Sequence, residues 1–417
     1  MRLSSFCKFT IIFFVIFGVN AKLLHVSVLF RHGARTSGNY YENFEKYFLG
    51  IAEQELTPNG FTQELLLGRY LRHRYIKNND SNFKNFLPSR FDEEKINFKV
   101  SETQRTIFSS IGLLSGLYPH ATFLLEKGSN ISNHNLPPLN FNFNVSLLKN
   151  KTFQIIPHEN DTFFHANDCF DKDKILYKYT ESEKRTIDKL ESIFPEIIRD
   201  IRNSSYDIKK VKGFIDVVNA LDNLISNFSM DIYDEETKEL FRKTALYAWY
   251  KTNLSDYKSI LLSSLLLADL KNNLDSCLEK EEKRLKFLSN EVTKCFKVNF
   301  YALHDTNIVE ILRNILEENY LNDLREKGIK NENIYKLLVP PYATSLIFEL
   351  HSEGEEYYVR IILNGEEPFT TFRSVEYEKN RGIEYDLFKE MLESRISPDI
   401  ESINCKSKIN MDVFKFW

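Results

Sequence analysis

A nearly continuous apolar segment followed at once by a basic cluster constrains this chain more than any other feature. Residues 23–30 read LLHVSVLF, and residues 31–35 read RHGAR. A short apolar run with β-branched residues predicts a strand that is buried in a sheet. Positive charge at the end of a buried strand is costly unless an anion compensates it. The pattern therefore predicts either an anion-binding loop or a surface loop that is basic by chance.

The residue types in this cluster favour the binding of phosphate. Arg31 and Arg35 each present a planar fork of donors that matches phosphate or carboxylate oxygens. The two cations disfavour protonation of His32, which leaves a ring nitrogen free to attack. We expect Gly33 to let the backbone come close to the bound group. A nucleophilic imidazole inside an anion-binding loop is suited to attack on a phosphoryl group.

The segments on either side of the loop alternate between strand and helix patterns. Thr57 is a predicted N-cap, and Pro58 occupies the first position of a helix that continues to about residue 75. A strand and a helix are then predicted within residues 96–117. Strand patterns return at the end of the chain, in residues 296–303, 344–351 and 357–363, with a turn at Asn364-Gly365. This order predicts a sheet with crossover helices.

The chain divides by composition into a split core and an insertion. Residues 22–125 and 296–417 carry the strand patterns and are predicted to form one α/β core. Residues 126–295 contain Asn- and Ser-bearing stretches and long charged helical runs, which predict an exposed, mainly helical cap. Four polar residues of the insertion have no common metal-site spacing, and we interpret them as part of a polar loop: His158, Asp161, His165 and Asp168.

The first 21 residues have the pattern of a signal peptide. Arg2 and Lys8 flank a short polar start, an apolar run of about ten residues follows, and small Ala21 stands at the expected cleavage position. The alternative, an N-terminal membrane anchor, is disfavoured because the run is short for a bilayer. We therefore expect a mature chain that begins near Lys22 and folds in an oxidising compartment.

Cysteines and glycosylation signals agree with export. Once Cys7 leaves with the signal peptide, four cysteines remain, and three pairings are open; we favour Cys277 with Cys295 and Cys169 with Cys405. Eight N-x-S/T sequences are candidate glycosylation sites. They lie at Asn79, Asn130, Asn144, Asn150, Asn160, Asn203, Asn227 and Asn253.

Several motifs in the same order resemble the histidine acid phosphatases, which form branch 2 of the histidine phosphatase superfamily and include the lysosomal and prostatic types. The family signature R-H-G-x-R-x-P is matched by residues 31–35, although Ser37 stands where the family has proline. Further similar blocks are residues 56–75, residues 101–119 around Arg105, residues 301–307 with the His304-Asp305 pair, and residues 339–366.

The resemblance implies a fold and a set of residue roles. The fold would be α/β, a phosphoglycerate-mutase-like core in which helices flank a central mixed sheet, with the helical cap inserted. His32 would be the nucleophile, and Asp305 would donate a proton to the leaving group. The phosphate oxygens would be held by Arg31, Arg35, Arg105 and His304. No metal or other cofactor is implied, because guanidinium groups neutralise the phosphate.

We therefore expect an exported acid phosphatase, secreted or lysosomal, that hydrolyses small phosphate monoesters through a phosphohistidine. A phytase or lipid-phosphate phosphatase of the same family stays open, as does a secreted phosphate-binding glycoprotein without turnover. A net charge of only −4 gives no indication of nucleic acid binding. No stable membrane insertion is expected after the signal peptide is removed, and a homodimer is left open.

Overall fold

The structure is a computed structural model of the 417-residue chain. It describes residues 21–36, 54–78, 86–119, 153–156, 256–285 and 295–397, apart from residue 374, together with a few residues between these ranges. Residues 1–20 of the predicted signal peptide lie outside the described residues, as do Ser37, Cys169, Cys405 and all eight candidate glycosylation sites.

The described strands and helices alternate in the first part of the chain, as the sequence predicts, whereas nearer its end several helices and then several strands follow one another directly. The strands are β1 (Lys22–Arg31), β2 (Ile96–Ser101), β3 (Phe153–Ile156), β4 (Val298–Leu303), β5 (Ser345–Glu353), β6 (Glu356–Leu363), β7 (Thr371–Phe372), β8 (Val375–Glu376) and β9 (Ile383–Glu384). The helices are α2 (Pro58–Tyr75), α3 (Gln104–Leu117), α8 (Asp256–Leu285), α9 (Asp305–Ile315), α10 (Glu318–Lys330), α11 (Glu332–Leu338) and α12 (Tyr385–Glu393).

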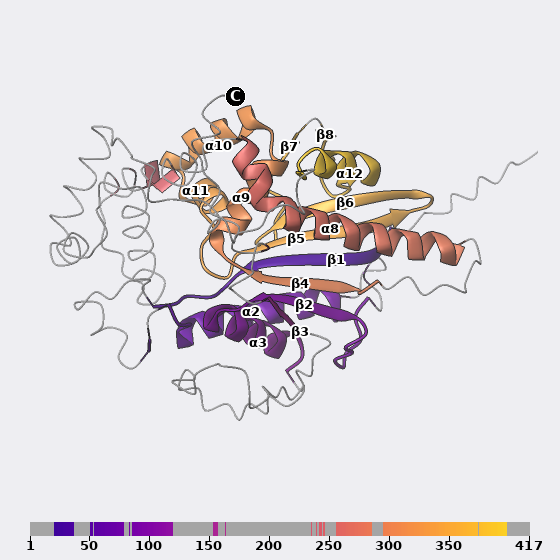
Figure 1. The fold of residues 1–417 in the computed structure, drawn as a ribbon, viewed down its shortest axis with the longest axis horizontal. Helices are drawn as coiled ribbons and strands as arrows, with labels where there is room; N and C mark the ends of the chain where they lie inside the picture. Colours follow the sequence, from indigo (N-terminus) through magenta and orange to yellow (C-terminus); the bar gives the residue numbers. More distant parts are fainter. Residues whose placement is uncertain are drawn as a thin grey trace, which may run out of the picture.

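A mixed sheet of seven strands forms the centre of the molecule, in the order β3-β2-β4-β1-β5-β6-β9 (Figure 1). The four strands from β3 to β1 are parallel to one another, whereas β5, β6 and β9 continue the sheet in antiparallel fashion. A two-stranded sheet of β7 and β8 is separate. The predicted α/β class with a central mixed sheet is therefore confirmed.

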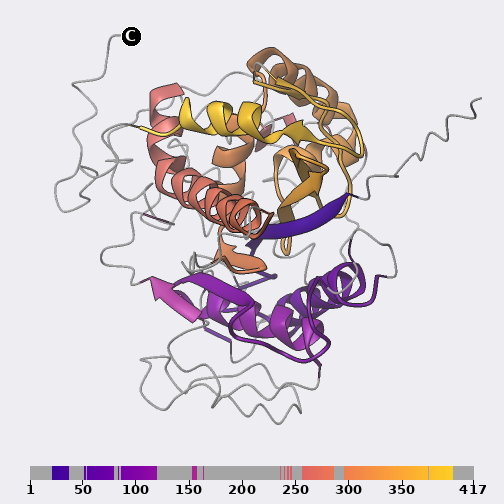
Figure 2. The same cartoon turned by 90° about the vertical axis from the view of Figure 1, so that its right-hand side faces the viewer.

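Helices cover both faces of the sheet (Figure 2). On one face, α2 and α3 pack against Val28, Phe98 and Phe300. On the other face, α8, α9 and α12 pack against Leu29 and Phe348. Successive strand residues point to opposite faces, so β1, with both faces covered, is apolar along nearly its whole length. This accounts for the continuous run that marks β1 in the sequence.

Local sequence signals agree with the helix and strand boundaries. The Thr57 hydroxyl accepts a hydrogen bond from the Gly60 amide, and Pro58 begins α2, so the predicted N-cap is confirmed. Within the range predicted as an insertion, β3 pairs with β2 in the main sheet, and α8 packs against the core. The division into a core and a helical cap stays a prediction, because most of residues 126–295 lies outside the described part of the chain.

A buried carboxylate joins helix α2 to the antiparallel part of the sheet. Glu349 of β5 accepts two hydrogen bonds from Arg74, at 2.6 and 2.9 Å, and one from the Tyr75 hydroxyl at 2.6 Å. His351 lies 3.1 Å from the same carboxylate. Although burial opposes ionisation, the bonds from His351 and Arg74 lower the pKa of Glu349 to about 2. This cluster therefore remains charged in moderately acidic solution.

A second buried carboxyl has no such partners. Glu64 lies on α2 and is fully buried, and neither of its oxygens has a hydrogen-bond partner among the described residues. Its Cβ lies against α3 near Gly112. Burial without a compensating cation or donor raises the pKa of the Glu64 carboxyl well above its ordinary value. The group is therefore held in its neutral form between the two helices.

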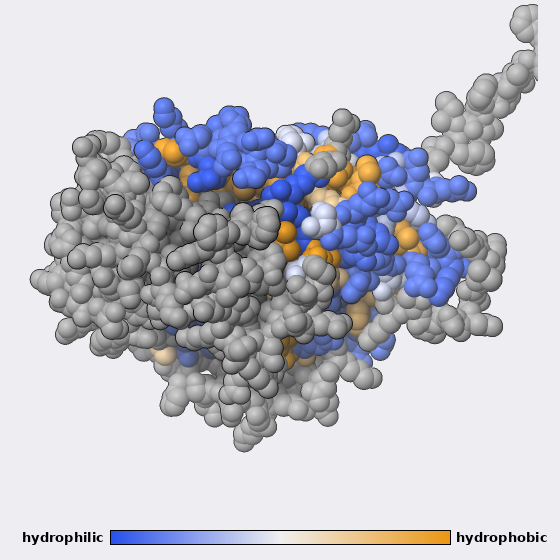
Figure 3. Space-filling model, turned by 45° about the horizontal axis from the view of Figure 1, so that its top comes forward, coloured by the Kyte–Doolittle hydropathy of each residue, from blue (hydrophilic) through white to orange (hydrophobic). Residues whose placement is uncertain are grey.

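The described part of the surface in Figure 3 is mostly hydrophilic, with hydrophobic residues in small groups. Large exposed hydrophobic side chains occur singly, at Leu66, Ile155 and Leu387. Within the described ranges, no helix has the length and apolar character needed to cross a bilayer.

We predict that Glu64 makes the fold less stable as the pH rises. The pKa of the Glu64 carboxyl is higher in the folded chain than in the unfolded chain, so in acid the carboxyl is protonated in both states and has no effect. Above about pH 4.5, Glu64 ionises in the unfolded chain but not in the folded chain, which favours unfolding. Glu64→Gln should therefore raise the free energy of unfolding at pH 7.5, by roughly 1 kcal/mol or more, and change it little at pH 4. Thermal and urea unfolding at both pH values measure this.

Glu326→Gln is the matched control for Glu64→Gln, because Glu326 is an exposed residue on α10. The control should show the same small change at both pH values. A gain for Glu64→Gln that is equally large at pH 4 and pH 7.5 would contradict the assignment of a neutral buried carboxyl.

Candidate active site

Three neighbouring parallel strands end at the same edge of the sheet, and each carries a predicted site segment just beyond its end. β4 lies between β2 and β1, with Ala302 paired to Val100 on one side and Leu303 to Arg31 on the other. His32 follows β1, His304 follows β4, and Arg105 lies in the first turn of the helix after β2. Ligands of open α/β sheets bind at such carboxyl edges. Segments separated by some 270 residues of sequence thereby meet at one place.

Arg31 is buried and oriented by three contacts. Its Nη1 donates to the Pro340 carbonyl at 2.6 Å, and its Nη2 lies 2.6 Å from Oδ2 of Asp305. The ring of Tyr342 covers one face of the guanidinium, with the ring centroid 4.0 Å from Cζ. The buried Nε has no hydrogen-bond partner among the described residues. Arg31 therefore has a fixed orientation and at least one donor still to be satisfied.

His32 is buried and held in one tautomer. Its Nδ1 lies 2.9 Å from the Gly33 carbonyl, which can only accept, so Nδ1 carries the proton and Nε2 keeps its lone pair. Burial lowers the pKa of His32 well below its ordinary value, and the charges of Arg105, His304, Arg31 and Arg35 lower it further. The imidazole is therefore neutral and available as a nucleophile even in acidic solution.

The loop that follows β1 is fixed by side chains from the two helices on that face. The Gly33 amide donates to Ser109 Oγ of α3 at 3.0 Å, and the Ala34 amide donates to Gln63 Oε1 of α2 at 2.9 Å. A Cβ atom at Gly33 would lie only 2.1 Å from the Gly60 carbonyl oxygen. The close approach of the α2 backbone therefore requires glycine at this position, and the closeness of the Gly33 backbone to a bound group stays a prediction.

Arg35 and Arg105 add positive charge to the same region. Arg35 donates from Nη1 to its neighbour Thr36, and its backbone pairs with Leu56. Arg105 has two long contacts from Nη1 to Gln54, at 3.4 and 3.5 Å. Burial and the nearby Arg35 lower the pKa of the Arg105 guanidinium, as expected for cations crowded together. The described charges of the site favour the binding of an anion.

His304 and Asp305 begin helix α9. The His304 amide donates to Asn307 Oδ1 at 3.0 Å, and its ring Nε2 lies 3.2 Å from the Ser101 hydroxyl. The His304 and His32 rings meet edge to face, with centroids 5.4 Å apart. Asp305 is paired with Arg31, so the carboxyl group lies directly beside the site. The structure thus brings together all six residues that the sequence predicted for catalysis and phosphate binding.

One residue of this site was not predicted as such. Tyr342 lies 5.8 Å from His32 between ring centroids and also covers Arg31. Sequence reasoning included it only in a block that resembles the family. In the sequence, Tyr342 follows Pro340 and Pro341 just before a predicted strand. This position does not reveal that the strand runs antiparallel to β1, which is what brings Tyr342 to the site.

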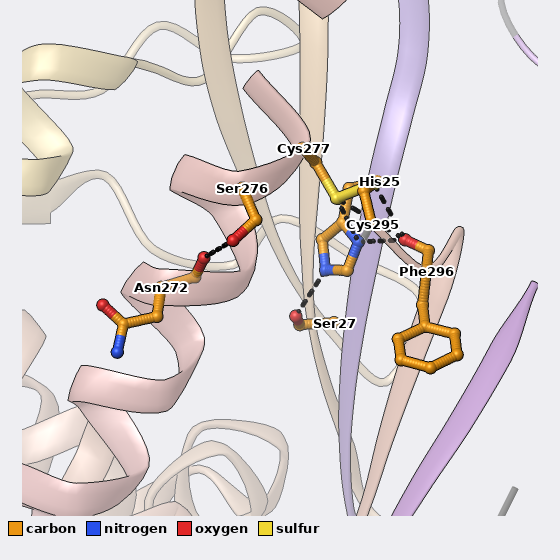
Figure 4. The surroundings of a disulfide bond; sticks show 7 residues. All are labelled: His25, Ser27, Asn272, Ser276, Cys277, Cys295 and Phe296. Atoms are coloured by element: carbon orange, nitrogen blue, oxygen red, sulfur yellow. Dashed lines mark hydrogen bonds between the residues drawn. A yellow bond between two sulfur atoms is a disulfide. The ribbon is translucent and has the colours of Figure 1, made fainter. Parts of the chain in front are cut away.

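The predicted Cys277–Cys295 disulfide is present (Figure 4). It lies against His25 of β1, whose Nδ1 donates to the Phe296 carbonyl at 2.8 Å. Burial lowers the pKa of His25 to about 4, so the ring stays neutral. His25 and the two sulfur atoms are close enough to hold a metal, but here the sulfurs are bonded to each other. The predicted partner pair, Cys169 and Cys405, lies outside the described residues, as do His158, Asp161, His165 and Asp168.

Comparisons with known proteins agree with this geometry. A model of the histidine phosphatase superfamily (branch 2) matches residues 22–364. The chain is 24% identical to putative acid phosphatase 10 of Caenorhabditis elegans, over 81% of this chain and 80% of that protein. It is 22% identical to prostatic acid phosphatase of Bos taurus, over 84% of this chain and 79% of that protein.

Solved structures show the same fold at lower sequence identity. The phytase from Citrobacter braakii superposes with a TM-score of 0.58 at 13% identity, over 91% of this chain and 99% of that one. The family match covers most of the chain and includes β1, β2, β4, β5 and every predicted site residue. The chain therefore belongs to branch 2 of the histidine phosphatase superfamily.

Proposed function

We propose that the chain is an acid phosphatase that hydrolyses phosphate monoesters through a phosphohistidine on His32. The observation that carries this proposal is a neutral, buried His32 with its Nε2 lone pair available, surrounded by guanidinium groups. A neutral nucleophile in a cationic site can bind a phosphate dianion and attack it without electrostatic repulsion. Membership of a histidine phosphatase family and similarity to proteins named acid phosphatases support the same reading.

In the first step, His32 Nε2 attacks phosphorus, and the bond between phosphorus and the ester oxygen breaks. Asp305 gives a proton to the departing ester oxygen, which leaves as an alcohol, and Asp305 is left as a carboxylate. In the second step, water attacks the phosphohistidine and returns a proton to Asp305, while the phosphorus–nitrogen bond breaks to release inorganic phosphate. Positioning and fixed positive charge would supply most of the rate acceleration.

We assign the remaining roles to the residues around His32. Arg31, Arg35, Arg105 and His304 would hold the phosphate oxygens. Asp305 forms an ion pair with Arg31, with its Oδ2 2.6 Å from Nη2. An arriving phosphate would take over this guanidinium and release the carboxyl to act as the acid. That role needs a protonated Asp305, which favours acidic solution.

Two alternative functions would use the same site: hydrolysis of a more specific phosphate ester, and binding of phosphate without hydrolysis. Solved structures of this fold include phytases, which favours testing inositol phosphates beside simple esters and lipid phosphates. A binding protein without turnover would keep the cationic site and release no product. Hydrolysis of p-nitrophenyl phosphate at pH 5 without added metal separates an enzyme from a binding protein, and a panel of natural phosphate esters then narrows the substrate.

We also propose that the protein acts after export through the secretory pathway, as a secreted or lysosomal enzyme. The Cys277–Cys295 disulfide supports this proposal, because such bonds persist in oxidising compartments.

Replacing His32 by alanine should abolish turnover, with a loss of about 10⁴-fold or more in kcat, because the variant lacks the imidazole that would form the covalent intermediate. Rapid quenching with ³²P-labelled substrate should trap a phosphoenzyme in the unmodified protein and none in His32→Ala. The control His73→Ala replaces an exposed histidine of α2 and should behave as wild type. Full activity of His32→Ala would end the proposal.

Replacing Asp305 by asparagine should slow alkyl phosphates by roughly 10²–10⁴-fold and aryl phosphates much less, because a nitrophenolate leaves without protonation. The ratio of kcat values for β-glycerophosphate and p-nitrophenyl phosphate measures this. Asp386→Asn, at an exposed position in the first turn of α12, is the matched control. Equal losses on the two substrates would show that Asp305 is not the acid.

A further inference from the structure

Tyr342 reaches the site because of the direction of one strand. β5 runs antiparallel to β1, with Phe30 paired to Ser345, so the residues just before β5 lie beside those just after β1. Two backbone bonds fix this contact. The Ala343 amide donates to the His32 carbonyl at 3.2 Å, and the Arg31 amide donates to the Thr344 carbonyl at 2.9 Å. The segment carrying Tyr342 is thereby bound to the segment carrying the nucleophile.

The Tyr342 ring adds a third contact to Arg31, on the face of the guanidinium. Pro340 and Asp305 bind the two terminal nitrogens, whereas the aromatic ring lies over the face of the guanidinium, 4.0 Å from Cζ. An arginine stacked on an aromatic ring is attracted by the ring's negative face, and more strongly where water is excluded. Arg31 is 1% exposed and Tyr342 is 7% exposed, so this contact is dry.

The backbone next to Tyr342 is strained. Ala343 has φ +59°, a left-handed conformation that is unfavourable for a residue with a Cβ atom. Such strain persists only where the surroundings enforce it, and it concentrates at functional sites. Here the bond from the Ala343 amide to the His32 carbonyl enforces it. The strained residue therefore holds the tyrosine ring over Arg31 and beside His32.

We propose that Tyr342 is a positioning residue whose ring face orients the Arg31 guanidinium toward the phosphate and keeps water from His32. The inference rests on the proposed function and adds an uncharged residue to the six that were predicted for catalysis and phosphate binding. It concerns the aromatic ring, which contacts both Arg31 and His32.

A residue that merely fills the core would affect stability alone. A positioning role also affects phosphate affinity and the pH dependence of attack by His32. The described charged groups that act on His32 are the basic Arg31, Arg35, Arg105 and His304, and Asp305 is paired with Arg31. Since burial is the largest cause of the lowered His32 pKa, admitting water should raise that pKa. The acid limb of kcat/KM should then move to higher pH.

The test compares replacements that keep or remove the ring. Tyr342→Phe keeps the ring face, whereas Tyr342→Leu and Tyr342→Met keep apolar bulk without it. Tyr357→Leu is the control, because Tyr357 lies near the start of β6, at the opposite edge of the sheet. Isothermal titration calorimetry with inorganic phosphate at pH 5 measures binding, and p-nitrophenyl phosphate gives kcat, KM and the pH profile.

We expect the Leu and Met variants to bind phosphate about 10- to 30-fold more weakly, with a similar loss in kcat/KM and an acid limb at higher pH. The Phe and control variants should stay within about twofold of wild type in phosphate affinity. Wild-type affinity in the Leu and Met variants, or an equal loss in Tyr342→Phe, would overturn the proposal. Failure of both non-aromatic variants to fold would assign Tyr342 a structural role and overturn it too. A wild-type protein that binds phosphate but hydrolyses no ester would refute the proposed function, while calorimetry would still test Tyr342.

Discussion

The pairing of β1 with β4 on one side and β5 on the other is the constraint on which the site depends. The parallel pair places His32 beside His304, and the antiparallel pair places Tyr342 beside Arg31. Arg31 ends β1, and the other three residues lie just outside a strand, where the ladder has already fixed the backbone. The β1 strand can hold this central place because it is apolar on both faces and is covered by helices on both. Its burial therefore determines the geometry of a site that lies beyond its end.

The charges of the site determine which group it can bind and whether His32 can act as a nucleophile. Arg31, Arg35 and Arg105 lie close together around His32, and Asp305 forms an ion pair with Arg31. Their mutual repulsion is tolerated because hydrogen bonds from the loop to Ser109 and Gln63 hold the backbone in place. The same charges keep His32 neutral, so one arrangement attracts an anion and preserves the nucleophile that would attack it.

Much of this could be predicted from the sequence, for identifiable physical reasons. The apolar run of β1 and the Thr57-Pro58 start of α2 are local signals, and each is confirmed. The convergence of Arg31, Arg105 and His304 followed from the resemblance to a family. Tyr342 and Glu64 were missed because their roles depend on strand direction and helix packing, which no local pattern records. The packing requirement at Gly33 was missed for the same reason, because the backbone that a Cβ atom there would meet belongs to helix α2.

Glu64 follows Gln63 directly on α2, and Gln63 holds the loop that carries His32. Two properties would therefore depend on pH for different reasons. The stability of the fold would depend on the buried Glu64 carboxyl, and the rate of the reaction on the proton that Asp305 donates. An activity curve recorded after long incubation would combine both, whereas initial rates after a brief pH jump would isolate the chemistry. At neutral pH the buried Glu64 carboxyl would lower the stability of the fold without taking part in the chemistry at His32.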